Sequence, residues 1–356
     1  MKFNDLKSSL KEVLSTQATS YEYGDTLEFL MDKCWELGAD NVEIDEHDNL
    51  YVTKGIADVY PCVVSHTDTV HDIYKGYKVY EVKGSFVAFD SDTMRQVGVG
   101  GDDKVGMWVC LEMLRRFDNI KIAFFAQEEI GCVGSSHADF EFFSNVGYAL
   151  ECDRQGSSDF VQKSSGVKMF GEEFEKLISS TLKDYGYSIK DGGLTDVHEI
   201  AQDMGIACAN MSCGYYNPHS KQEYVKIKEA INTFNLVKSL VTLLGETMHS
   251  HKAEDTYASY GYGASYGSKK SKKVINSSPQ FSGCDMCGAI STDGCDFCVT
   301  ESTYLTSTTP SSKVKVTSYC TCGGELRSYG AGVNKYTHCY SCGYYEDALT
   351  PLTPPF

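Results

Sequence analysis

The sequence lacks any apolar run close to the roughly 18 residues that a membrane-spanning helix requires. Its first residues, MKFNDLKSSLKEVL, also lack the unbroken apolar core of a signal peptide, because Asp5 and Glu12 interrupt it. We therefore expect a chain with no membrane partner, no secretion signal and a cytoplasmic location.

Basic residues are few in this chain. It has 32 Lys and Arg against 49 Asp and Glu, which gives a net charge of -17. Residues 249–356 hold nine residues of each sign, so the whole excess of acid lies in residues 1–248. This excess of acidic residues argues against a function that requires binding to the phosphate backbone of nucleic acids. It favours cationic ligands, such as metal ions and substrates with a free amine.

The length of 356 residues and a hydrophobic share of 42% suit a globular chain of two domains, or one domain with an appendage. Strands are predicted at 41–47, 49–53, 61–65, 77–90, 121–126, 147–152 and 206–212, and helices near 6–14, 27–34, 103–117, 171–185, 195–204 and 225–246. This alternation predicts an α/β fold with a mostly parallel, mixed central sheet and helices on both faces.

Composition divides the chain into three parts. Residues 1–248 carry all of the predicted strands and helices. Residues 249–283 are rich in Ser, Gly, Tyr and Lys, cannot bury a core, and are predicted to be a flexible linker. Residues 284–347 hold eight closely paired cysteines and are predicted to form a small separate module.

Polar side chains follow several of the predicted strands at the point where each strand ends. His66-Thr67-Asp68, Gln127-Glu128-Glu129, Asp153 and Pro218-His219 do so, and Gly100-Gly101-Asp102-Asp103-Lys104 opens a helix. Ligand sites of open parallel sheets lie at the carboxyl ends of the strands. Imidazoles and carboxylates that converge there suit a pair of zinc ions. Each group alone has an ordinary structural explanation, such as a helix cap or a solvated carboxylate.

The ordered segments SHTDTV (65–70), GGDDKVG (100–106), AQEEIGCVGS (126–135), ECD (151–153) and NPHSKQE (217–223) resemble the zinc-dependent exopeptidases. That group includes peptidase T, bacterial glutamate carboxypeptidase, aminoacylase and the single-domain zinc aminopeptidases. The resemblance covers residues 5 to 248 and implies a catalytic domain at 1–248. It does not reach the cysteine-rich tail.

The resemblance implies a role for each matching residue. His66 and Asp153 would bind one zinc ion, Glu129 and His219 the second, and Asp102 would bridge both. Asp102 is preferred over Asp103 because it lies two residues before Lys104, as the bridging residue does in the family pattern.

Two further residues match catalytic positions of the family. Glu128 would be the general base and acid, taking a proton from a zinc-activated water and passing it to the leaving amine. Asp68 would orient His66, because metal-bound imidazoles usually need a hydrogen-bonding partner behind them.

The chain departs from peptidase T in one respect. Only 65 residues separate Asp153 from His219, and the segment between His66 and Asp102 is equally short. We therefore expect no inserted lid domain, and no lid arginine to hold a substrate carboxylate. Asp196 and Glu151 are weak candidates for pairing with a substrate amine, although Asp196 also suits a helix cap with Thr195.

The tail cysteines are predicted to bind one or two structural zinc ions. One set is Cys284, Cys287, Cys295 and Cys298, and the other is Cys320, Cys322, Cys339 and Cys342. Thiolates at such spacing enclose tetrahedral zinc, and the second set looks like a zinc ribbon. The pairs could also interleave between sets, and a redox role for the Cys-x-x-Cys pairs is the alternative.

Three functions fit these observations. The leading hypothesis is a dizinc exopeptidase, most simply an aminopeptidase with short peptides as substrates. The alternative enzymatic function is that of a deacylase or amidohydrolase for N-acyl amino acids, because the same metal chemistry can catalyse both reactions. The third is a non-catalytic binding protein whose zinc-ribbon-like tail contacts a protein or a nucleic acid.

Overall fold

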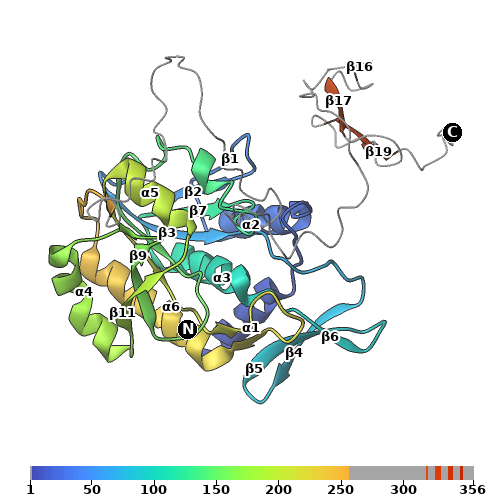
Figure 1. Cartoon of the computed structure of the whole chain (residues 1–356), viewed down its shortest axis with the longest axis horizontal. Helices are drawn as coiled ribbons and strands as arrows, with labels where there is room; N and C mark the ends of the chain where they lie inside the picture. Colours follow the sequence, from blue (N-terminus) through green and yellow to red (C-terminus); the bar gives the residue numbers. More distant parts are fainter. Residues whose placement is uncertain (1, 256–317, 320–324, 330–335, 340–344, 348–356) are drawn as a thin grey trace, which may run out of the picture. The chain divides into compact units, whose positions relative to one another are not determined.

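The computed structural model describes residues 2–255 and four short segments, 318–319, 325–329, 336–339 and 345–347 (Figure 1). The chain divides into two units, Met1–Gly267 and Ser268–Phe356. In the described part of the chain, no helix has both the length and the apolar character needed to cross a membrane.

A ten-stranded sheet forms the centre of the first unit. Its order is β1 (Asn41–Ile44), β2 (Leu50–Lys54), β7 (Ile120–Phe125), β3 (Tyr60–His66), β8 (Val146–Glu151), β12 (Ala207–Met211), β9 (Asp159–Ser164), β10 (Val167–Lys168) and β15 (Glu254–Asp255), with β11 (Ser188–Gly192) beside β9. The four central strands β7, β3, β8 and β12 run parallel. On the two sides of these central strands, β2 pairs with β7 and β9 pairs with β12, and both pairs are antiparallel. The predicted mixed sheet with a parallel centre is therefore present.

Helices cover both faces of this sheet (Figure 1). They are α1 (Phe3–Leu14), α2 (Gly24–Glu36), α3 (Gly101–Arg116), α4 (Glu172–Asp184), α5 (Asp196–Met204) and α6 (Ile227–Leu244). On β3, Val63 packs in one core with the buried faces of α1, α2, α3, α4 and α6. Its neighbours Cys62 and Val64 pack in a second core with α5. Because both faces are buried, β3 is apolar at successive positions instead of alternating.

The sequence prediction missed β9 and β11. β9 has the sequence DFVQKS, and β11 has the sequence SIKDG with exposed or half-buried side chains. Neither segment has the apolar character of a buried strand, and β11 is held by its pairing with β9. Tertiary pairing, which composition does not record, made both of them strands.

A second sheet lies beside α1. It consists of β4 (Tyr77–Val82), β5 (Ser85–Asp90), β6 (Arg95–Val97), β13 (Tyr215–Tyr216) and β14 (Tyr224–Lys226). Its strands flank two loops, the one that leads into α3 and the one between β13 and β14. Val225 on β14 pairs with Phe86 on β5. This pairing joins the segment before α3 to the strand that follows the loop of His219, although Phe86 and Val225 are 139 positions apart in the sequence.

The described part of the second unit is a four-stranded antiparallel sheet. Its strands are β16 (Ser318–Tyr319), β17 (Glu325–Tyr329), β18 (Tyr336–Cys339) and β19 (Tyr345–Asp347). Cys339 ends β18, whereas Cys284, Cys287, Cys295, Cys298, Cys320, Cys322 and Cys342 lie outside the described residues. The zinc sites of the tail therefore stay a prediction.

Residues 249–255 hydrogen-bond to the large sheet. The Ala207 N–H donates to His249 O at 2.8 Å, and the His249 N–H donates to Gly147 O at 2.9 Å. The His251 N–H donates to Gly205 O at 2.8 Å, and β15 pairs with β10. These contacts fasten residues 249–255 beside β8, β10 and β12, and β8 and β12 lead into the site described below.

We expect a chain truncated after Asp255 to fold and to keep the metal centre, whereas truncation after Met248 should lower the free energy of unfolding by about 2–4 kcal/mol. The reason is the loss of these hydrogen bonds, each worth roughly 1 kcal/mol. Urea denaturation of the two truncated chains would measure the difference. Equal unfolding midpoints would show that residues 249–255 contribute nothing to the fold.

Candidate metal centre

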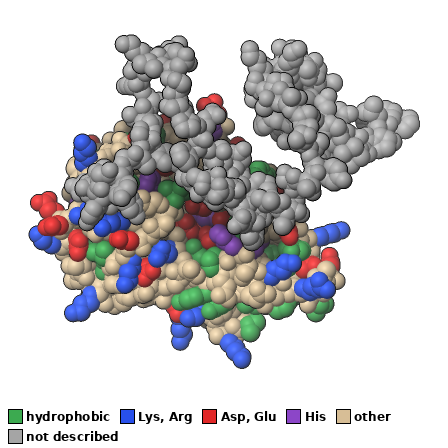
Figure 2. Space-filling view, in the orientation of Figure 1, with side chains coloured by type: hydrophobic (Ala, Val, Ile, Leu, Met, Phe, Trp, Pro, Cys, Tyr) green, Lys and Arg blue, Asp and Glu red, His purple; other side chains and the backbone are tan. Residues whose placement is uncertain are grey.

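The carboxyl ends of the central strands bring the predicted site residues together. His66 is the last residue of β3, Glu128 and Glu129 follow β7, and Asp153 follows β8. Because these strands are parallel, their carboxyl ends meet at one edge of the sheet. Asp102 reaches the same place from the start of α3, and His219 reaches it from the loop between β13 and β14. Figure 2 shows acidic side chains gathered with histidine at the centre of this face.

The Asp102 carboxylate lies between two imidazoles. Its Oδ1 is 3.2 Å from His66 Nε2, and its Oδ2 is 3.3 Å from His219 Nε2. The same nitrogen of His219 is 3.0 Å from Glu129 Oε2. Each oxygen of Asp102 thus faces a different histidine, which is the arrangement that a ligand shared by two cations needs.

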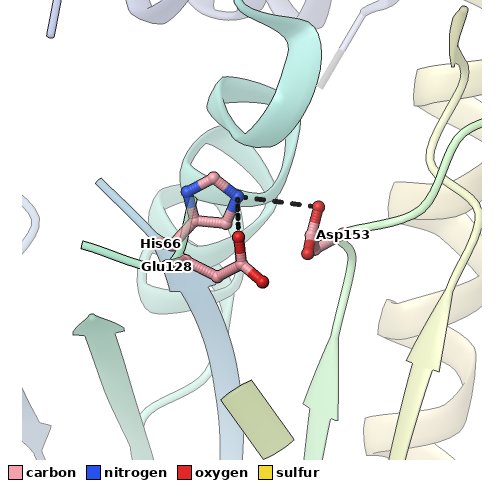
Figure 3. Close-up of side chains that lie close together, drawn as sticks. All are labelled: His66, Glu128 and Asp153. Atoms are coloured by element: carbon pink, nitrogen blue, oxygen red, sulfur yellow. Dashed lines mark ion pairs between the residues drawn. The ribbon is translucent and has the colours of Figure 1, made fainter. Parts of the chain in front are cut away.

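His66 faces two further carboxylates (Figure 3). Its Nε2 is 3.7 Å from Asp153 Oδ1 and 4.0 Å from Glu128 Oε2. The ligand atoms of His66, Glu128 and Asp153 all lie within 4.8 Å of one another, and so do those of His66, Asp102 and Glu129. Both groups are compact enough to surround a metal ion.

Asp68 connects His66 to the loop that carries the two glutamates. Its Oδ1 is 3.4 Å from His66 Nδ1 and accepts a hydrogen bond of 2.9 Å from the Glu128 N–H. Its Oδ2 accepts a 2.6 Å hydrogen bond from the Ser20 hydroxyl. One buried carboxylate therefore positions both an imidazole and the backbone of Glu128.

The Asp103 carboxylate contacts backbone N–H groups instead of the two imidazoles. Its carboxylate accepts hydrogen bonds from the Gly106 N–H at 3.0 Å and the His66 N–H at 3.3 Å. A side chain at Gly101 would collide with Val225 and Tyr215, whose atoms would lie 2.6 and 2.7 Å from its Cβ. The glycine allows the start of α3 to approach the second sheet closely.

The fully buried Glu223 fixes the backbone before Asp102. It accepts hydrogen bonds from the Gly100 N–H at 2.6 Å and the Asp102 N–H at 3.1 Å, and its Oε2 is 2.6 Å from His71 Nε2. Glu223 belongs to the same loop segment as His219, four residues later. It therefore ties the loop of His219 to the loop of Asp102.

Asp153 is held by two side chains from other strands. The Asn210 side chain accepts a hydrogen bond from the Asp153 N–H at 2.9 Å and donates one to the Asp153 carbonyl at 2.7 Å. The Tyr215 hydroxyl donates to Asp153 Oδ1 at 3.2 Å. Sequence patterns did not predict supporting roles for Glu223, Asn210 and Tyr215. Only Glu223 had a signal, its place in the segment NPHSKQE.

Asp196 and Glu151 do not reach the surface of the site. Both are fully buried, and Asp196 accepts a 2.5 Å hydrogen bond from the Ser135 hydroxyl. Thr195 precedes α5 but donates its hydroxyl to Glu151 instead of capping the helix. The expectation that Asp196 or Glu151 meets a substrate amine is therefore wrong, because α5 and β8 enclose both groups.

Burial and like charges shift the proton affinities of the carboxyl groups. Burial raises the pKa of Glu128 to about 9, of Glu151 to about 8 and of Asp153 to about 6. Hydrogen bonding to Asp102 and then to Glu129 raises the pKa of His219 to about 10. So many buried acidic groups are costly to ionise together unless a cation lies among them.

The side chains present fit metal ions. Glu129 Oε1 is buried and has no hydrogen-bond partner among the described residues, so a cation beside it would satisfy it. Imidazole nitrogens and carboxylate oxygens are ligands that zinc takes in hydrolytic sites. His66, Asp102 and Asp153 would hold one ion, and Asp102, Glu129 and His219 would hold the other.

A cavity of about 250 Å³ opens over these groups. Its walls carry the carboxylates Asp102, Glu128, Glu129 and Asp153 together with His219. The remaining lining residues are Arg154, Gln155, Val161, Gly192, Gly193, Leu194, Asn210, Tyr215 and Pro218. A small molecule in this cavity would therefore contact the candidate metal ligands directly.

Comparison with solved structures finds the same fold in several peptidases. The aminopeptidase PepT of Bacillus cereus gives a TM-score of 0.57 at 17% identity, over 68% of this chain and 99% of its own. A tripeptidase of Staphylococcus aureus gives 0.56 at 15%, over 68% and 99%. An aminopeptidase of the archaeon Desulfurococcus kamchatkensis gives 0.54 at 15%, over 67% and 95%. No protein-family model and no curated protein sequence matches the chain.

We expect the protein in a chelator to melt at a lower temperature at pH 8 than at pH 6. Raised carboxyl pKa values mean that the folded state binds more protons than the unfolded state, so stability falls as pH rises through these values. The raised pKa of His219 acts in the same direction above its ordinary value of 6.5. Each kcal/mol lost should lower the melting temperature by about 2–4 °C.

Added zinc should reverse this pattern, because metal binding removes the protons that the ligands hold. Calorimetry at the two pH values, with chelator and with zinc, gives the four melting temperatures. If zinc stabilised the protein no more at pH 8 than at pH 6, these carboxylates and imidazoles would not be its ligands.

Proposed function

We propose that this protein is a dizinc metallopeptidase that removes N-terminal residues from short peptides. The observation that carries the proposal is the position of Asp102, whose two oxygens lie 3.2 and 3.3 Å from the imidazoles of His66 and His219. The fold shared with aminopeptidases and a tripeptidase is consistent with it. The cavity over the metal ligands supplies room for a small substrate.

Zinc ions at this centre would lower the pKa of bound water toward neutrality and polarise the carbonyl of the peptide bond. The protein's own part is to keep their ligands in place. Asp68, Glu223 and Asn210 do this from behind the centre, by accepting hydrogen bonds from the backbone N–H groups of the proposed ligands Glu129, Asp102 and Asp153. Geometry fixed in this way limits the reorganisation that the reaction needs.

Glu128 is the proposed proton carrier. Its Oε1 accepts a hydrogen bond of 3.4 Å from the Cys132 thiol, and its Oε2 is 4.0 Å from His66 Nε2. Burial and the neighbouring carboxylates raise the pKa of this half-buried carboxyl to about 9 in the absence of metal ions. Two cations beside it would lower that pKa, so that the ionised carboxylate could accept the proton of the attacking water and give it to the amine that leaves.

Glu128→Gln should keep both metal ions but lower kcat by roughly 10²–10⁴-fold, because an amide cannot accept the proton. Glu129→Gln is the contrasting variant and should lower the zinc content from two ions to one. Metal analysis and steady-state kinetics on the same preparations test both. Near wild-type turnover by the zinc-loaded Glu128→Gln protein would rule out the role of Glu128.

The enzyme should also prefer substrates with a free α-amine. Carboxylates line the cavity, and the acidic first unit attracts cations. A charged amine paired with a carboxylate should raise kcat/KM by roughly 10–100-fold over its N-acetyl form. The assay compares an amino-acid amide with the acetylated amide. Equal or faster turnover of the acetylated compound would favour the N-acyl amino acid deacylase instead.

A further inference from the structure

One arginine lies in the wall of the otherwise acidic cavity. Arg154 directly follows the candidate ligand Asp153 and lines the cavity beside Gln155 and Leu194. Among the described lining residues it is the only Lys or Arg. The cavity wall therefore carries the carboxylates of the candidate metal centre and, directly after Asp153 in the sequence, the permanently charged guanidinium of Arg154.

The Arg154 side chain is fixed at one edge. Its Nε donates a 3.0 Å hydrogen bond to Asp159 Oδ2 at the start of β9. Asp159 is itself held, because its backbone carbonyl accepts a 2.9 Å hydrogen bond from the Ser212 N–H. The Arg154 carbonyl accepts a hydrogen bond of the same length from the Cys213 N–H. The guanidinium is therefore positioned before any ligand arrives.

The other edge of the guanidinium lies among cavity residues. Its Nη1 lies 3.2 Å from the point that a Cβ on Gly192 would occupy, and Gly192 and Gly193 both line the cavity. Neither Nη1 nor Nη2 has a hydrogen-bond partner within the described ranges of the chain. Two parallel N–H groups of this kind match the two oxygens of a carboxylate.

An ordinary surface ion pair would explain the contact with Asp159. Such a pair contributes little to stability, and it does not require the absence of a side chain at Gly192, where a Cβ would lie 3.2 Å from Nη1. The ion pair uses Nε and leaves the terminal nitrogens available. The arrangement is that of a guanidinium held from one side so that it can bind an anion with the other.

We propose that Arg154 binds a carboxylate of the substrate, and so selects peptides that carry this group one or two residues beyond the cleaved bond. The inference rests on the proposed function. The candidate metal ligands and Arg154 line the same cavity, and an extended peptide advances about 3.3–3.6 Å per residue. A short peptide can thus reach from the metal centre to Arg154. A cavity of about 250 Å³ also favours a small substrate.

The test uses the full chain with its zinc and three substrates of equal length: Leu-Gly, Leu-Gly amide and Leu-Glu amide. We expect the wild-type enzyme to prefer Leu-Gly over Leu-Gly amide by roughly 10–100-fold in kcat/KM, mainly through KM. If the side-chain carboxylate of Leu-Glu amide restores the rate, Arg154 also accepts an acidic residue. If Leu-Glu amide is hydrolysed as slowly as Leu-Gly amide, Arg154 binds only the C-terminal carboxylate.

Arg154→Met should remove the preference by slowing Leu-Gly, together with Leu-Glu amide if the wild-type enzyme prefers that substrate too, while leaving Leu-Gly amide unchanged. Arg154→Lys should keep part of it, because the charge remains but the paired N–H groups are lost. Arg95→Met is the matched control, since Arg95 is exposed on β6 and does not line the cavity. It should leave all three rates unchanged.

The outcomes separate this inference from the proposed function. Equal hydrolysis of Leu-Gly and Leu-Gly amide by the wild-type enzyme would overturn the role of Arg154 and leave the peptidase standing. An equal loss on all substrates in Arg154→Met would reduce Arg154 to a structural ion pair, which also overturns the inference. No hydrolysis of any peptide by zinc-loaded enzyme would overturn the proposed function, and this inference with it. Should Arg154→Met fail to fold, the wild-type preference and Arg154→Lys decide.

Discussion

Repulsion among buried carboxylates is the constraint on which the rest of the site depends. Asp102, Glu128, Glu129 and Asp153 line one small cavity, and among the described residues the imidazoles of His66 and His219 are the groups that form ion pairs with them. A fold would not gather these groups for stability alone, because each ionised carboxylate loses solvation on burial. The cluster makes physical sense as a place for cations, and the buried, unpartnered Glu129 Oε1 points to the same conclusion.

The fold holds this cluster by hydrogen bonds that reach the backbone as well as the side chains. Asp68 accepts a hydrogen bond from the Glu128 N–H, and Glu223 accepts hydrogen bonds from the Gly100 and Asp102 N–H groups. The Asn210 side chain hydrogen-bonds to both the N–H and the carbonyl of Asp153. Each of these connects loops that are distant in sequence. The positions of the candidate metal ligands are thus set by the strands and the loops directly after them. Such a support keeps the geometry of a site fixed while a small molecule binds and leaves.

The cavity also explains how an acidic protein could hold a zwitterionic peptide. The carboxylates of the candidate metal centre occupy one part of its wall, and the Arg154 guanidinium, which is hydrogen-bonded to Asp159, occupies another. In this chain the 65 residues between Asp153 and His219 form β9, β10, α4, β11, α5, β12 and β13. Within residues 2–255, a cationic partner for the carboxylate of a substrate would have to come from the strands and loops of the sheet, where Arg154 lies.

The sequence by itself determined the parallel centre of the sheet and the helices that cover it, because apolar runs such as PCVVS and KIAFFA can be buried only between two layers. It also singled out the seven residues His66, Asp68, Asp102, Glu128, Glu129, Asp153 and His219, through short motifs at strand ends. Only the tertiary structure decided that Asp102 faces both imidazoles while Asp103 contacts backbone N–H groups, that Glu223 and Asn210 hold the ligands, and that Asp196 and Glu151 are enclosed. The physical reason is that these relations are contacts between segments far apart in the chain, and local sequence carries no record of which side chains will meet.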